Sequence, residues 1–144
     1  MRMNVQIKLI DPSLPLPAYQ TAGSVAFDLY SRIDIEVAPK SIVLVPLNII
    51  VKTPEGYVFL ISPRSSLAKK KGLFQGNHIG VIDQDYCGES DEVLFCAYNF
   101  TDEIVRIEKG ERIAQGMFLP VEKVGLIQVE KMDDKNRGGF GSTG

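Results

Sequence analysis

The sequence predicts an all-β protein, either a sandwich or a barrel. Short runs rich in Val, Ile, Phe and Tyr recur along the chain, and turn signals separate them, such as residues 53–56 (TPEG) and 108–111 (EKGE). This spacing is typical of antiparallel sandwiches and barrels. No window of about a dozen residues keeps a helical apolar stripe, so a βαβ nucleotide-binding fold is disfavoured.

Seven apolar runs are predicted as strands. In chain order they span residues 5–10, 26–30, 42–51, 57–61, 93–99, 104–107 and 113–119. One short helix is predicted between the fourth and fifth runs, from Ser65 or Ser66 to Lys71. A serine can cap its start, and Gly72 can end it. The helix start and Arg64 could bind phosphate, or the serines could simply cap a surface helix.

The end of the chain differs in composition from the rest. The whole chain has 144 residues, of which 44% are hydrophobic, and we predict a single domain over residues 1–130. Residues 131–144 begin with a polar run and carry four glycines in the last seven positions, so they cannot form a core of their own. A disordered end is one interpretation. Phe140 suggests another, a stacking group on a flexible Gly-rich strap.

Charge and composition exclude several classes of protein. The net charge of -2 and the lack of an extended basic patch argue against a nucleic-acid or membrane-surface binder. The run at 42–51 is too short to span a bilayer. The two cysteines, with no signal peptide before them, indicate a reduced, soluble protein of the cytoplasm.

Several site chemistries are also excluded. There is no Gly-Lys dipeptide for a phosphate-binding loop of the Walker type, and a single histidine without a Cys-x-x-Cys pair does not make a common zinc site. A calcium loop starting at Asp83 fails because Cys87 and Leu94 stand where oxygen ligands are needed. The remaining chemistry is that of carboxylate, arginine, serine and backbone amide groups.

Residues 80–89 (GVIDQDYCGE) form the most distinctive segment. Two carboxylates and an aromatic ring follow an apolar pair at a turn. Such a segment could be a site, or its residues could be there only for turn geometry.

Five segments together resemble the ordered motifs of the trimeric dUTP diphosphatases (dUTPases). They are residues 27–29 (FDL), 63–68 (PRSSLA), 80–89, 110–115 (GERIAQ) and 139–144 (GFGSTG). The resemblance implies a jelly-roll-like β-barrel and a homotrimer with sites shared between subunits. It also implies hydrolysis of dUTP to dUMP and pyrophosphate with Mg²⁺, which limits uracil in DNA and supplies dUMP for dTMP synthesis.

The resemblance also implies roles for residues of the 80–89 segment. Asp83 would hold and polarise the water that attacks the α-phosphorus. Tyr86 would pack under the deoxyribose and leave no room for a 2'-hydroxyl. The hairpin carrying Asn77, Gly80 and Ile82 would bind uracil, largely through backbone groups.

The other motifs would bind the phosphates, the metal and the closing strap. The triphosphate would contact Arg64, Ser65, Ser66 and Gln115. Asp28 would orient Mg²⁺ through water. The strap would stack Phe140 on uracil and close Gly141, Ser142 and Thr143 over the phosphates, with either Lys135 or Arg137 on the γ-phosphate.

The sequence departs from the family pattern at a few positions. Ala26 and Phe27 replace a glycine and a tyrosine, and residues 90–92 (SED) lengthen the loop after the third motif. Two alternatives remain: a dCTP deaminase of the same superfamily, and a non-catalytic nucleotide-binding protein on this scaffold. The complete third and fifth motifs favour the diphosphatase.

Overall fold

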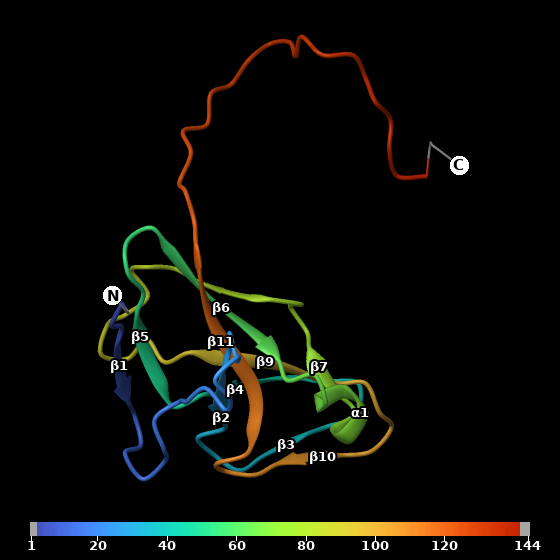
Figure 1. Ribbon diagram of the computed structural model, residues 1–144. Helices are drawn as coiled ribbons and strands as arrows, with labels where there is room; N and C mark the ends of the chain where they lie inside the picture. The colour runs from blue at the N-terminus through green and yellow to red at the C-terminus, as the bar shows by residue number, and fades with distance from the viewer. Residues whose placement is uncertain (1–2, 142–144) are drawn as a thin grey trace.

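The computed structural model describes residues 3–141, and they form an all-β barrel with one short helix (Figure 1). The strands are β1 (Gln6–Leu9), β2 (Phe27–Tyr30), β3 (Ile35–Val37), β4 (Ile42–Pro46), β5 (Ile49–Lys52), β6 (Tyr57–Pro63), β7 (Leu73–Gln75), β8 (Gly80–Ile82), β9 (Leu94–Asn99), β10 (Val105–Ile107) and β11 (Arg112–Pro120). The helix is α1 (Leu67–Lys71). The predicted all-β fold class is confirmed.

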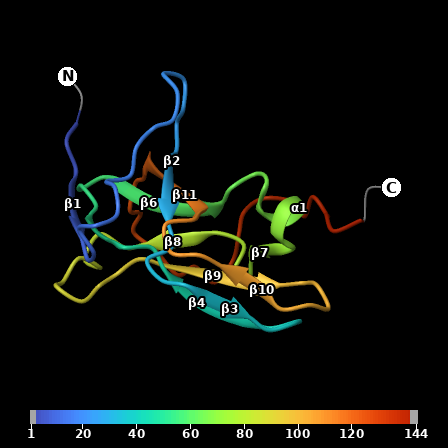
Figure 2. The same ribbon diagram turned by 90° about the horizontal axis from the view of Figure 1, so that it is seen from below.

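All strand pairs are antiparallel, and two larger sheets make the walls. One has the order β2-β11-β6-β8 and the other β4-β9-β7, while β1 pairs with β5 and β3 with β10. Figure 2 shows β6 and β11 in one layer and β4 and β9 in the other. Alternate residues of each strand point inward. Phe59 and Ile61 of β6 and Phe95 and Ala97 of β9 therefore belong to one hydrophobic core, and each of them is at most 1% exposed.

The apolar run over residues 42–51 forms two strands, because the chain breaks at Asn48 between β4 and β5. Asn48 has a left-handed backbone with φ of 67°, which asparagine tolerates better than most residues. It is buried, and its side chain accepts a hydrogen bond from the amide of Asp11 at 2.6 Å and donates one to the carbonyl of Asp11 at 3.0 Å. The break therefore ties this corner to the chain after β1.

The predicted helix is confirmed over Leu67–Lys71, and it ends at Gly72 in a left-handed conformation with φ of 67°. The predicted serine cap is wrong in one respect. Ser66 occupies the N-cap position, but its side chain makes no capping hydrogen bond. The helix is five residues long, and no helix among residues 3–141 has the length and apolarity needed to cross a membrane.

The last strand, β11, ends at Pro120, and the segment that follows it runs away from the barrel (Figure 1). Residues 121–141 contain no helix or strand, and nearly all of them are exposed. The division of the chain at residue 130 stays a prediction, since regular structure ends before it.

Candidate active site

The carboxylate of Asp83 lies on the surface directly after β8, beside the start of β6. β8 pairs with β6 so that Ile82 faces Phe59. A hollow of about 590 Å³ opens here, lined by the end of β8, Asp83, Gln84 and residues of the β6 start, with Val121 and Lys123 at its rim. The exposed carboxylate can therefore reach a water molecule or ligand in the hollow.

The side chain of Gln84 fastens this loop to the barrel. Its amide nitrogen donates hydrogen bonds to the carbonyl of Tyr57 at 2.9 Å and to that of Pro54 at 3.4 Å. The backbone amide of Tyr86 also donates to the carbonyl of Asp83 at 3.3 Å. Asp83 is thus exposed on a turn that Gln84, the next residue, anchors to the barrel.

The ring of Tyr86 is held at its tip while 37% of the residue stays exposed. Its hydroxyl donates a hydrogen bond to the carbonyl of Glu92 at 2.9 Å. The Glu92 carboxylate accepts hydrogen bonds from Nε and Nη2 of Arg32 at 2.7 and 2.9 Å. It also accepts one from the backbone amide of Asn48 at 2.9 Å. These hydrogen bonds with Glu92 raise the pKa of the Arg32 guanidinium. The longer loop over residues 90–92 therefore contains the anchor of Tyr86.

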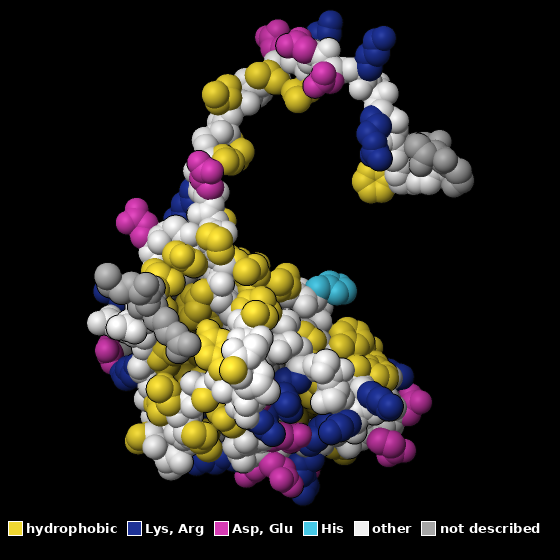
Figure 3. Space-filling model, viewed as in Figure 1, with side chains coloured by type: hydrophobic (Ala, Val, Ile, Leu, Met, Phe, Trp, Pro, Cys, Tyr) yellow, Lys and Arg dark blue, Asp and Glu magenta, His cyan; other side chains and the backbone are white. Residues whose placement is uncertain are grey.

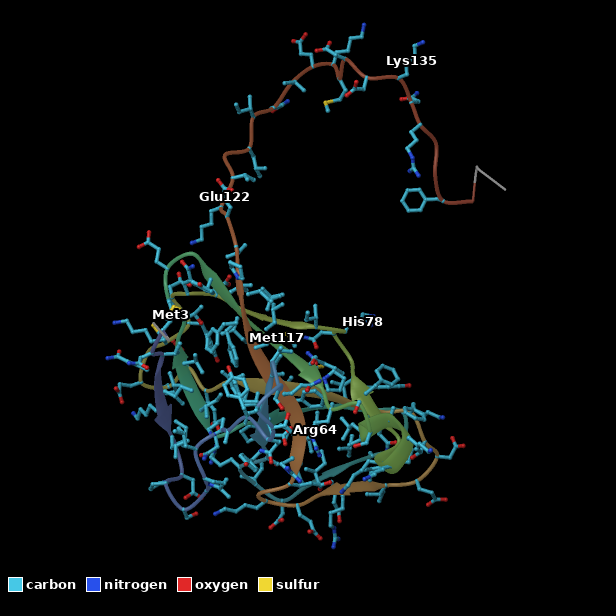
Figure 4. The ribbon with its side chains drawn as sticks, viewed as in Figure 1. Met3, Arg64, His78, Met117, Glu122 and Lys135 are labelled. Carbon is cyan, nitrogen blue, oxygen red and sulfur yellow. The ribbon has the colours of Figure 1, made fainter. Side chains whose placement is uncertain are left out.

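The predicted hairpin around Asn77 is not a paired β-hairpin, because its two strands belong to different sheets. β7 pairs with β9, and β8 pairs with β6. Among residues 3–141, neither β7 nor β8 has a strand on its second edge. The connection is exposed at Asn77 and His78, where His78 has a left-handed φ of 65° (Figure 4). We use the name slot for these two unpaired strand edges and the connection between them, residues 73–82.

Gly80 is the first residue of β8 and must lack a side chain. A Cβ at this position would lie 2.2 Å from Cγ1 of Ile61, which is far inside van der Waals contact. The backbone of β8 at Gly80 therefore lies directly against the core.

A second region gathers residues of three other predicted motifs around a buried carboxylate. Asp28 is only 6% exposed, and its two oxygens receive Nε of Arg64 and Nη1 of Arg112, each at 3.0 Å. Gln115 faces Asp28 across the β2–β11 pair and donates its amide to the carbonyl of Pro63 at 3.1 Å. The structure brings Asp28, Arg64 and Gln115 together, as the sequence predicts.

This region carries a surplus of positive charge. A hollow of about 300 Å³ is lined by Arg64, Arg112, Lys70 and Ser66, among others, and Ser65 is exposed beside it. Figure 3 shows Lys and Arg side chains gathered on this face, around the position labelled Arg64 in Figure 4. Such a surface suits a polyanion such as a phosphate chain. The sequence reasoning missed Arg112, although it lies within the 110–115 motif.

Asp83 and Arg64 lie at opposite ends of β6. Asp83 follows the residue paired with Phe59, whereas Arg64 follows Pro63 at the other end of the strand. Val58 lies next to Asp83 and six positions before Arg64. Six positions correspond to on the order of 20 Å along a strand. One chain alone does not bring the two regions together.

The predicted residues of the strap lie apart from both regions. Figure 4 shows Lys135 on the segment that arches away from the barrel, with Arg137, Phe140 and Gly141 following it. Phe140 is fully exposed. Ser142 and Thr143 lie outside the described residues.

The residues present suit Mg²⁺ only through water. Residues 3–141 contain no group of three or more His, Cys, Asp or Glu side chains that could hold a metal ion. One oxygen of Asp28 accepts a hydrogen bond from Arg112, the other forms an ion pair with Arg64, and each oxygen keeps a further acceptor position. That position fits a metal-bound water better than the ion itself, in keeping with the hydration that Mg²⁺ retains.

These features define a β-barrel protein whose candidate site is divided between the two ends of one strand. The family model of the dUTPases matches residues 13–144. A deoxyuridine 5'-triphosphate nucleotidohydrolase of Hydrogenobaculum is 43% identical over 145 residues, which cover 99% of both chains. The chain belongs to the dUTPase family.

Solved structures agree with this assignment. A dUTPase from Streptococcus mutans superimposes with a TM-score of 0.76 at 33% identity, covering 83% of this chain and 98% of that one. A Staphylococcus bacteriophage 80alpha dUTPase with dUPNHPP has a TM-score of 0.85 at 26% identity and 98% coverage of both chains. The jelly-roll-like barrel predicted from the resemblance is confirmed.

Proposed function

We propose that the chain hydrolyses dUTP to dUMP and pyrophosphate. Membership of the dUTPase family supports this activity. The observation that carries it is the display of Asp83 at the end of β8, where Gln84 anchors the turn and the hollow of about 590 Å³ opens beside the carboxylate. The site is thus suited to a reaction in which water attacks next to a bound base and sugar.

Asp83 is the proposed catalytic base. It holds a water molecule and accepts its proton as the water oxygen bonds to the α-phosphorus. The bond between that phosphorus and the oxygen bridging to the β-phosphate breaks, and pyrophosphate leaves with the electron pair. A carboxylate suits this role because its oxygens can accept a hydrogen bond from the water and then its proton.

The slot is the proposed site for uracil. Uracil presents acceptors at O2 and O4 and a donor at N3, which match the alternating amides and carbonyls of an open strand edge. Asn77, Gly80 and Ile82 supply that edge. Cytosine exchanges a donor and an acceptor and would leave buried groups without partners, which disfavours it.

Tyr86 is the proposed sugar discriminator. Its ring is fixed through Glu92, so it cannot swing aside easily to admit a 2'-hydroxyl. Rejection by a fixed aromatic wall needs that rigidity, because a mobile ring would adapt to the larger ribose.

The cationic region is the proposed triphosphate site. Arg64, Ser65, Ser66 and Gln115 would contact the phosphates, and donors placed near the leaving oxygen would stabilise the charge that develops on it. Asp28 keeps Arg64 and Arg112 in place and is the proposed contact to water on Mg²⁺, an ion that would neutralise phosphate charge.

We further propose that each complete site combines neighbouring chains of a homotrimer. The separation of Asp83 from Arg64 supports this, since a second chain can place its cationic region opposite the first chain's slot. The segment after β11 also exposes Val124, Leu126 and Ile127, at 71%, 93% and 86%, which favours packing on another subunit. Residues 131–144 would then close as a strap, with Phe140 on the base and Gly141, Ser142, Thr143 and Lys135 or Arg137 near the phosphates.

The cytoplasm is the proposed location of this reaction. Cys87 and Cys96 are free thiols, which supports a reducing compartment.

The test is a panel of dUTP, dCTP, dTTP and UTP with Mg²⁺, read by separating products chromatographically. Pyrophosphate should be released from dUTP far faster than from the other three. Conversion of dCTP to dUTP, or no release of pyrophosphate from dUTP, would contradict the proposal. Light scattering on the same sample should give three times the mass of one chain.

A further inference from the structure

The sheet β4-β9-β7 carries apolar side chains on both of its faces. Its inward residues, such as Phe95 and Ala97, belong to the core. Its outward residues are also aliphatic, aromatic or sulfur-containing, and we call six of them the outer sheet face: Ile42, Leu44, Phe74, Leu94, Cys96 and Tyr98. An antiparallel sheet with one face in water normally alternates apolar and polar residues. This sheet therefore has the composition of one that is covered on both sides.

The strand pair β3–β10 shows how this chain builds a face that meets water. Val37 and Ile107 point into the core, whereas Glu36 and Arg106 lie opposite each other on the outside and form an exposed ion pair. The outer sheet face has no charged residue in the corresponding positions. It differs from a solvated face and calls for a cover.

The outer sheet face is continuous from β4 to β7. Tyr98 of β9 is paired with Ile42 on one side and with Phe74 on the other, and its ring centre lies 4.9 Å from that of Phe74. A Cβ at Gly76, just after β7, would lie 3.2 Å from Sγ of Cys96 and 3.3 Å from Cδ1 of Ile42. The apolar surface thus extends without a gap past the end of β7.

The exposed area is large for a surface that meets only water. Ile42 and Leu44 are each 56% exposed. Phe74 and Leu94 are 37% and 38% exposed, and Phe100, directly after β9, stacks on Phe74. These side chains leave on the order of 500 Å² of apolar surface, near the upper end of what a monomer exposes. That is a large share of the roughly 800 Å² that each chain buries in a stable interface.

We propose that the outer sheet face is the surface on which copies of this chain dock to form the homotrimer. A second copy is favoured over a different partner because Phe74 belongs both to this face and to the slot, beside which the proposed function requires a neighbouring chain. The inference rests on the proposed function in this respect. The ion pair of Lys40 and Asp102 beside Phe100 adds a polar rim to an apolar centre, as in subunit interfaces.

Docking at this face leaves the slot accessible. Side chains of a strand stand perpendicular to its hydrogen-bonding edges, so a copy packed on Phe74 does not cover the unpaired backbone edge of β7. Association and base binding therefore use different sides of the same short strand.

The test is light scattering on Ile42→Glu and Leu44→Glu. Both side chains are more than half exposed in one chain, so the new carboxylate is solvated there unless another copy covers it. The unmodified protein should have three times the mass of one chain. Each variant should have the mass of one chain, because a symmetric contact brings the added charges together. Their kcat/KM for dUTP should fall about 100-fold or more, since groups of separate chains are no longer aligned.

The matched control is Leu16→Glu, which adds the same charge at a position that is 58% exposed, in the loop between β1 and β2. It should keep the mass and activity of the unmodified protein, and circular dichroism should show a folded chain in all three variants. Retention of the three-chain mass by both Ile42→Glu and Leu44→Glu would overturn the inference, as would an equal loss of mass in Leu16→Glu.

The thiol of Cys96 gives a second measurement that does not disturb the face. In Cys87→Ser it is the one remaining thiol, and it is only partly buried within one chain. A maleimide carrying a polyethylene glycol chain should label it about 100-fold more slowly than free cysteine, because a covered group reacts only when the copies separate. A rate close to that of free cysteine would overturn the inference.

These measurements keep the inference separate from the proposed function. If the unmodified protein hydrolyses dUTP while both charged variants keep its mass, only the docking surface is wrong. If both variants separate into single chains but the unmodified protein does not hydrolyse dUTP, the docking surface stands and the hydrolytic function fails.

Discussion

The hydroxyl of Tyr86 donates a hydrogen bond to the backbone carbonyl of Glu92, 2.9 Å away, across the loop that carries Asp83. The side chain of Glu92 is in turn fixed by Arg32 and is only 13% exposed. The ion pair between Arg32 and Glu92 thus helps to fix the position of the Tyr86 ring in the proposed sugar site.

Removing that hydrogen bond should weaken discrimination against ribose. In Tyr86→Phe we expect the ratio of kcat/KM for dUTP to that for UTP to fall about three- to tenfold, because a hydrogen bond worth about 1 kcal/mol no longer fixes the ring. Glu92→Gln should lower the ratio in the same direction by removing the charge that holds Arg32. The control is Glu36→Gln, which breaks the exposed pair with Arg106 and should leave the ratio unchanged. An unaltered ratio in Tyr86→Phe would show that packing alone positions the ring.

Replacing the proposed catalytic base should stop turnover without preventing binding. Asp83→Asn should lower kcat for dUTP by about 10² to 10⁴, the usual contribution of a positioned general base. Affinity for dUMP should change little, since the carboxylate acts on water. Asp85→Asn is the matched control in the same turn and should retain most activity. Comparable losses in both variants would mean that the turn, and not Asp83 itself, had been disrupted.

Neutralising the buried carboxylate of the cationic region should affect both stability and phosphate binding. Asp28→Asn removes the charge that accepts a hydrogen bond from Arg112 and forms an ion pair with Arg64, and hydrogen bonds to charged groups are commonly worth about 1.5–3 kcal/mol. We expect urea denaturation to show a loss of about 2 kcal/mol. The Mg²⁺ concentration needed for half-maximal turnover should also rise. A stability loss with unchanged Mg²⁺ dependence would remove Asp28 from the metal site.

Shortening the chain after Met132 should reduce activity far more than stability. Residues 133–141 contain no helix or strand and are almost entirely exposed, so the barrel loses few contacts. We expect kcat/KM for dUTP to fall at least tenfold, because closure over the substrate excludes water and aligns the attack. Circular dichroism should give an unfolding temperature within a few degrees of the full chain. Phe140→Ala tests the stacking residue alone and should produce part of the same loss. Full activity in the truncated chain would rule out a strap.

The sequence by itself determined the fold class, the helix and its end, and the residues of the family motifs. Alternating apolar runs are a local property, so β2, β6, β9 and β11 follow from period and turn residues alone. Gly72 ends α1 for an equally local reason, since glycine readily adopts the left-handed conformation. Five short segments in their order along the chain, from residues 27–29 to residues 139–144, indicated the family.

The tertiary structure determined which of these residues lie close together and which strands pair. β3, β7 and β8 have three residues each, too few to show a period, and only pairing with distant strands defines them. The assignment of β7 and β8 to different sheets, which creates the slot, depends on partners elsewhere in the chain. The burial of Glu92 and Gln75 and the distance of Asp83 from Arg64 likewise arise from long-range packing. Such contacts leave no periodic mark in the sequence, because they join residues whose separation along the chain is arbitrary.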